Sequence, residues 1–182
     1  MCLFVENAGI ASLDITVYKA MIRFEFKDGD VIYSTPLRKE MVPPTVMTGV
    51  NPFVAQKSHG FRYEYVLETS PDGKACLMQE DRFSGNKAKT REKAAFASQG
   101  FIHCYSSLTD LRTDWHYWRS VFVGSYSLSE YSLVVFECVV PKGTLYCTGL
   151  FGDTPAMCAE RLVFKKEINF PTEEQKEIEF IN

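Results

Sequence analysis

Residues 131–140, with the sequence YSLVVFECVV, are apolar at nearly every position. A strand that is exposed on one face alternates apolar and polar residues, so a nearly continuous apolar run is typical of a strand covered on both faces. The run is too short to cross a membrane as a helix, which takes about 20 residues. The chain is therefore expected to contain a sheet with this strand at its centre.

Two further regions show the alternation of half-buried strands. Residues 15–26 alternate apolar and charged side chains, and the turn sequence at residues 28–30 predicts that residues 31–33 pair back as a hairpin. A second turn signal, at residues 71–73, predicts another hairpin. The second hairpin is placed at 61–67 and 74–78, the remaining strands at 101–105, 144–147 and 161–168, and loops at 79–86 and 149–155.

Two short helices are expected between the strands. One would begin at Asn86 and end near Ala97, and the other would begin after Ser107, a favourable N-cap residue. The second helix carries an apolar stripe at helical spacing, which we interpret as core rather than as a ligand site: Leu108, Leu111, Trp115 and Trp118. The predicted fold class is α+β, with a curved, mainly antiparallel sheet and two short helices.

The length of 182 residues favours one domain, which we place at residues 1–170. Four prolines mark an irregular segment at residues 34–58, and a segment of that length is typical of a lid, a binding loop or a docking arm. Residues 171–182 form an acidic tail.

The formal net charge of −3 gives the chain no general attraction to nucleic acid or to anionic membranes. None of the six cysteines forms a Cys-x-x-Cys pair, so we expect no metal site, and reduced, mostly buried thiols in a cytoplasmic protein. The sequence shows no signal peptide and no motif that indicates a cofactor.

His103 is the first candidate for chemistry, because imidazole exchanges protons near neutral pH. It lies in the run Gly100–Tyr105, just before two serines and a predicted helix. Glu137 interrupts the most apolar strand, where a carboxylate is costly unless it is paired or faces a cleft. Lys19 and Arg23 on the first strand are its possible partners, and together the four residues would form an anion-binding or RNA-cleaving cleft. The alternatives are a structural histidine that bonds a backbone carbonyl and a glutamate at a sheet edge.

We predict that the strand at residues 101–105 also lies at the centre of the sheet, beside residues 133–140. A basic cluster lies between the second hairpin and this strand. Its members are candidates for contact with RNA phosphates, although a charged run on a short helix is more often a solvated face. The residues are Arg82, Lys87, Lys89, Arg91 and Lys93.

The stretch Gly100–Leu108, followed by Leu133–Glu137 and Pro141, resembles a group of small bacterial and phage domains with a "GFIHCS" run and a later "LVVLE" strand. Those domains look like the ADP-ribosyltransferase superfamily, which implies a related core and, as one possibility, a nucleotide-binding cleft at His103 and Glu137. More loosely, the small acidic chain resembles type II-A anti-CRISPR proteins. That resemblance implies a phage or mobile-element inhibitor in the bacterial cytoplasm that acts on a Cas9-type nuclease, or on its guide RNA by docking or cleavage.

Overall fold

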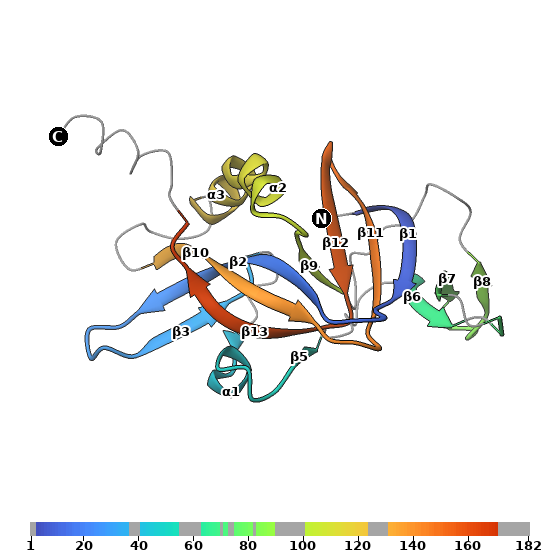
Figure 1. The fold of residues 1–182 in the computed structure, drawn as a ribbon, viewed down its shortest axis with the longest axis horizontal. Helices are drawn as coiled ribbons and strands as arrows, with labels where there is room; N and C mark the ends of the chain where they lie inside the picture. Colours follow the sequence, from blue (N-terminus) through green and yellow to red (C-terminus); the bar gives the residue numbers. More distant parts are fainter. Residues whose placement is uncertain are drawn as a thin grey trace.

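The computed structural model describes residues 3–36, 41–54, 63–69, 71–72, 75–81, 83–89, 101–123 and 131–170. This part of the chain is mostly antiparallel sheet with a few short helices, as Figure 1 shows, and the predicted fold class is confirmed at that level. The described strands lie in a six-stranded, a four-stranded and a three-stranded sheet.

The six-stranded sheet contains the run that the sequence predicted to be central. β10 (Tyr131–Val140) is hydrogen-bonded to β2 on one side and to β13 on the other, and the prediction for this strand is therefore confirmed. The hairpin of β2 and β3 and the final strand were also predicted correctly. The order is β4 (Met41–Val42), β3 (Val31–Ser34), β2 (Ile15–Glu25), β10, β13 (Arg161–Ile168) and β5 (Phe53–Val54).

The four-stranded sheet has the order β1 (Phe4–Ile10), β11 (Leu145–Phe151), β12 (Thr154–Ala159) and β9 (Ile102–Cys104). The loop expected at residues 149–155 is wrong, because β11 continues through Gly149 and turns tightly into β12. Position 149 of this strand requires glycine, because a Cβ at this position would meet the backbone oxygen of Phe4 at 1.8 Å.

The strand β9 is not central, which corrects the prediction for residues 101–105. It lies at the edge of the four-stranded sheet, paired with β12. A single bridge, between Tyr18 and Tyr105, then connects the chain to β2 of the larger sheet. β9 therefore joins the two sheets, and its apolar side chains are buried by that junction rather than by strands on both sides.

The three-stranded sheet consists of β6 (Tyr63–Thr69), β7 (Ala75–Asp81) and β8 (Lys87–Lys89), and it confirms the second hairpin. β8 replaces the start of the helix expected from Asn86, and β7 continues into the loop expected from residue 79. The rest of that expected helix lies outside the described residues. In Figure 1 this sheet lies at the end of the molecule away from the helices α2 and α3.

Three short helices are described: α1 (Pro44–Met47), α2 (Leu108–Thr113) and α3 (Trp115–Val123). Ser107 caps α2 as predicted, since its side chain accepts a hydrogen bond from the backbone N–H of Asp110 at 3.1 Å. Leu111, Trp115 and Trp118 are buried, so the aromatic stripe belongs to the core. α1 and β5 show that the proline-rich segment contains short regular elements.

The core consists of two clusters, which lie on opposite faces of β2, β9 and β10. One cluster includes Ala20, Val135 and the two tryptophans, and the other includes Met21, Phe136 and Phe164. Within the described residues no helix is long and apolar enough to span a bilayer.

Candidate functional site

The side chain of His103 lies on β9 beside the tryptophan-containing core. Its Cα lies opposite that of Cys158 on β12, and its ring meets the ring of Phe151 edge-on, with centroids 6.1 Å apart. Phe151 in turn packs against Trp118 of α3, at 6.3 Å between centroids. The half-buried imidazole is thus positioned by aromatic packing at the junction of the sheet and the helices.

Lys19 is brought to His103, but it contacts the backbone rather than the imidazole. Its Nζ donates a hydrogen bond to the backbone oxygen of His103 at 3.0 Å, and the residue is only 6% exposed. Successive residues of a strand direct their backbone groups to opposite sides, so His103 and Tyr105, which are two positions apart, direct theirs to the same side, toward β2. Among the described residues, the chain bridges to β2 at Tyr105, just after β9, and the ladder goes no further, so the ammonium bonds the acceptor that a longer ladder would use.

Glu137 lies on the opposite face of the sheet from Lys19. In the register of β2 and β10, Glu137 is opposite Tyr18 and Lys19 is opposite Phe136, and adjacent residues of a strand point to opposite faces. The carboxylate of Glu137 pairs instead with Lys166 on β13, at 3.6 Å between Nζ and Oε2. The expected pairing of Glu137 with a basic side chain of β2 is therefore not what the structure shows.

Arg23 forms a separate group of charges near the end of β2. Its guanidinium lies 3.4 Å from a carboxylate oxygen of Glu25 and 3.6 Å from one of Glu167. Tyr33 donates its hydroxyl proton to the other oxygen of Glu167 at 2.9 Å. Partial burial, together with the hydrogen bond and the negative charge of Glu167, raises the pKa of Tyr33 to about 12.

Lys87 is the member of the basic cluster whose side chain the structure describes. Its ammonium pairs with Glu68 of β6 and lies 3.8 Å from Glu80 of β7. The hydrogen bond to Glu68 raises the pKa of Lys87 above its ordinary value. Lys89 ends β8 with its Cα opposite that of Met78, and Arg82, Arg91 and Lys93 lie outside the described residues.

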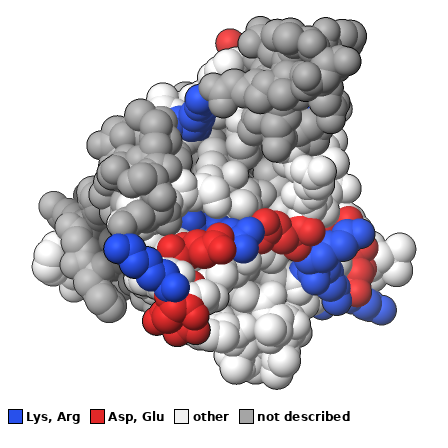
Figure 2. All heavy atoms as spheres, turned by 90° about the vertical axis from the view of Figure 1, so that its left-hand side faces the viewer, with Lys and Arg blue, Asp and Glu red and all other residues white. Residues whose placement is uncertain are grey.

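Among the described residues, Figure 2 shows Lys and Arg side chains beside Asp and Glu side chains in a band across the face that it presents. The ion pairs of Arg23 and Lys166 are of this mixed kind. Paired charges of opposite sign, such as those of these described residues, largely cancel at a distance.

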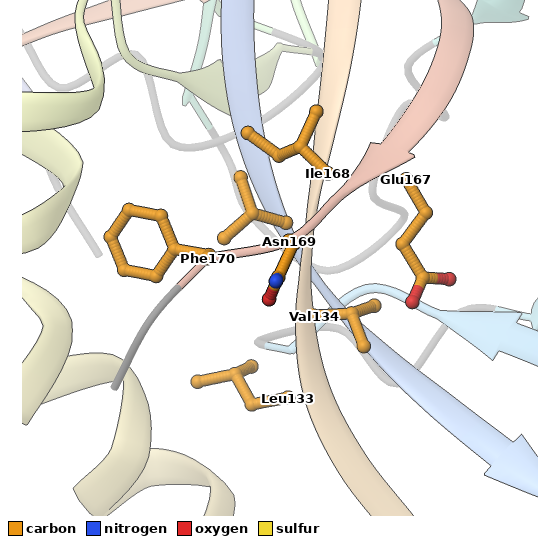
Figure 3. A pocket seen from close by; sticks show the side chains of 7 residues that line it. Leu133, Val134, Glu167, Ile168, Asn169 and Phe170 are labelled. Carbon is orange, nitrogen blue, oxygen red and sulfur yellow. The ribbon is translucent and has the colours of Figure 1, made fainter. Parts of the chain in front are cut away.

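A pocket of about 390 Å³, which sequence reasoning missed, lies where β13 ends beside β10 (Figure 3). β13 pairs with β10 only as far as Val135, whereas β2 pairs with β10 over its whole length. The only sequence signal for this pocket was a difference in length, because the strand predicted at residues 161–168 is shorter than the strand predicted at residues 131–140. The lining residues are Leu133, Val134, Val135, Glu167, Ile168, Asn169 and Phe170.

Cysteines at 76, 104, 138, 147 and 158 are free thiols, and the last four are buried. The reduced state expected of the cysteines stays a prediction, and Cys2 lies outside the described residues. Burial raises the pKa of the Cys104 thiol to about 12 and holds that of Cys158 well above its ordinary value. In the described part of the chain, no group of three or more His, Cys, Asp or Glu side chains is arranged to hold a metal ion.

Comparison of the chain with models of protein families, with curated protein sequences and with solved structures gave no match.

Proposed function

We propose that the chain is a binding protein that inhibits its target by docking, and that the target is a Cas9-type RNA-guided nuclease loaded with its guide RNA. The target class rests on the resemblance of this small acidic chain to anti-CRISPR proteins. The preference for docking over guide cleavage rests on the placement of the four residues expected to be catalytic. Each of them has a different structural role.

The position of Lys19 is the observation that carries this preference. A group that stabilises charge on a reacting phosphate must reach that phosphate. The ammonium of Lys19 is buried and bonds the backbone of β9 instead. Glu137, on the other face of the sheet, is paired with Lys166, and Arg23 is paired with Glu25 and Glu167. Lys87 likewise pairs with carboxylates of its own sheet, which favours a protein surface over RNA phosphates as the contact.

The experiment is a DNA-cleavage assay with a purified Cas9-type nuclease and its guide, with and without the chain. We expect cleavage to fall as the chain is added while the guide RNA stays intact on a denaturing gel. The variant His103→Ala should inhibit as well as the wild type. If the wild type shortened the guide RNA and His103→Ala left it intact, docking would be refuted and the catalytic hypothesis restored. If the chain did not impair DNA cleavage, the choice of target would be refuted.

A nucleotide-binding cleft of the ADP-ribosyltransferase type is the second candidate, and one feature of the register favours it. Glu137 is opposite Tyr18, which bridges to Tyr105, two residues along from His103, so the side chains of Glu137 and His103 share one face. Titration with NAD in a calorimeter tests this candidate directly. Saturable heat that disappears in Glu137→Gln would favour it, and the absence of heat would exclude it.

A further inference from the structure

The pocket at the end of β13 follows an open edge of β10. On the side away from β2, residues 132–134 have no strand partner in the described part of the chain, since β13 stops opposite Val135. Of any two consecutive residues in a strand, one directs its N–H and C=O groups to this open side. Such an edge is a template for another extended backbone.

The walls of the pocket suit the alternating side chains of an added strand. Figure 3 places Leu133 and Phe170 on the side of the helices, and Val134 and Glu167 on the side of β2 and β3. Phe170 is fixed there, because its ring packs on Trp115 at 4.8 Å between centroids. An extended guest would therefore place alternate side chains against an apolar wall and against a wall that contains a carboxylate.

The charges on the second wall select the kind of side chain that fits. Arg23 contributes one positive charge, and the two carboxylates that it contacts, Glu25 and Glu167, contribute two negative charges. The group is left with one net negative charge, and about a third of the Glu167 side chain is exposed. A basic side chain in the guest would be attracted to this wall, and an acidic one would be repelled.

We propose that the pocket binds an extended peptide segment of a partner protein by adding it as a strand to the edge of β10, with a Lys or Arg side chain directed at Glu167. Three edge residues without a strand partner on this side, in the described part of the chain, give a match of roughly 10 Å, so the backbone hydrogen bonds are few and the side chains decide the preference. The proposal goes beyond inhibition of a nuclease and does not depend on it.

The test is an NMR titration of the isotope-labelled chain with the capped peptide Thr-Val-Lys-Val-Thr-Val. We expect saturable shifts of the backbone amides of residues 132–134 and of Asn169. A peptide with N-methyl groups at alternate positions cannot form the ladder on one edge and should bind about tenfold more weakly or worse. Equal binding of the methylated peptide, or no shift of these amides at millimolar peptide, would overturn the proposal.

Charge selection is tested separately with Glu167→Gln and with the matched control Asp153→Asn, which removes one negative charge at the exposed turn between β11 and β12. The lysine peptide should bind several-fold more weakly to Glu167→Gln and unchanged to Asp153→Asn. A peptide with Glu in place of Lys should bind the wild type no more tightly than it binds Glu167→Gln. Equal weakening in both variants would reduce the preference to net charge and refute the assigned contact.

Discussion

The side chain of Lys19 closes a gap in the backbone hydrogen bonding at the point where the two larger sheets part. β2 bridges to the chain beyond β9 at Tyr18 and then pairs with β3 from Ile22 onward. Between these two pairings the backbone oxygen of His103 points toward β2, away from β12. The ammonium of Lys19 donates a hydrogen bond to this oxygen. A buried acceptor without a partner is costly, so this lysine has a clear structural role.

Replacing Lys19 with methionine should lower the free energy of unfolding by about 1–3 kcal/mol, since the methionine fills the space but leaves the His103 oxygen without this donor. Urea unfolding followed by circular dichroism measures the change. Lys27→Met, at an exposed position in the β2–β3 turn, is the matched control and should change stability by less than about 0.5 kcal/mol. Equal stability of Lys19→Met and the wild type would show that the bond contributes nothing.

The buried thiols predict a loss of stability at alkaline pH. The pKa of Cys104 is raised by burial from 9.0 to about 12, so the folded chain keeps a proton that the unfolded chain releases above pH 9. The stabilisation is complete below that pH and is lost as the pH rises toward 12. Between pH 8 and pH 10 one such thiol lowers the free energy of unfolding by about 1 kcal/mol.

The measurement is urea unfolding at pH 8 and at pH 10 for the wild type and for Cys104→Ala. The variant is less stable at both pH values because of its cavity, but its loss between them should be smaller by that amount. The change in the free energy of unfolding between pH 8 and pH 10 is the informative quantity, because the cost of the cavity is the same at both pH values and cancels. An identical loss in both proteins would refute a raised pKa at Cys104.

Among the elements, α2 and α3 are fixed to the four-stranded sheet by a chain of polar contacts. Trp118 donates its indole N–H to the hydroxyl of Tyr105 at 2.9 Å, and that hydroxyl donates to Asp114 at 2.7 Å. The other oxygen of Asp114 accepts a hydrogen bond from Thr154 of β12 at 2.6 Å. Burial and the bond to Asp114 raise the pKa of Tyr105, which keeps the hydroxyl protonated as a donor.

The start of α2 provides a test at this scale. Ser107→Ala removes the side-chain oxygen that accepts from the N–H of Asp110, and it should cost about 0.5–2 kcal/mol. Ser106→Ala changes the adjacent, exposed serine and should be nearly neutral. Thermal unfolding of the two variants side by side gives the comparison, and equal melting temperatures would show that the cap is not stabilising.

The elements predicted correctly are those whose pattern is local. Residues 15–25 alternate apolar and polar side chains, residues 131–140 form a nearly continuous apolar run, and Ser107 precedes an apolar stripe at helical spacing. β1 lacks such a pattern, because its sequence, FVENAGI, mixes small and polar residues, and Gly149 looks like a loop residue until the close approach of Phe4 is seen.

The candidate site was predictable only as a set of unusual residues. His103 and Lys19 do come together, but they are 84 positions apart, and no sequence pattern shows that the ammonium meets a carbonyl rather than an imidazole. The face on which Glu137 lies depends on the register of β2 and β10, which a single sequence does not reveal.

In the whole molecule the three sheets differ in how they are held. β10 is bonded on both sides over residues 135–139 and carries side chains of both core clusters. The three-stranded sheet has few contacts with the rest of the described chain, and the main ones are with β1 and β11. Its described ion pairs are on exposed or half-exposed side chains. Stability within a protein follows such differences in burial and bonding.

Hydrogen exchange measured by mass spectrometry should therefore divide the chain into two classes. Amides of residues 135–139 should exchange only through global unfolding, with an opening free energy equal to that from urea unfolding. Amides of β6 and β7 should exchange faster, by local opening that does not disturb β10. Lys19→Met, which weakens the junction of the two larger sheets, should speed exchange in β10 and leave the rate in β6 and β7 unchanged. If β6 and β7 slowed or accelerated together with β10 in this variant, the three sheets would unfold as one unit, and the lesser stability assigned to the three-stranded sheet would be wrong.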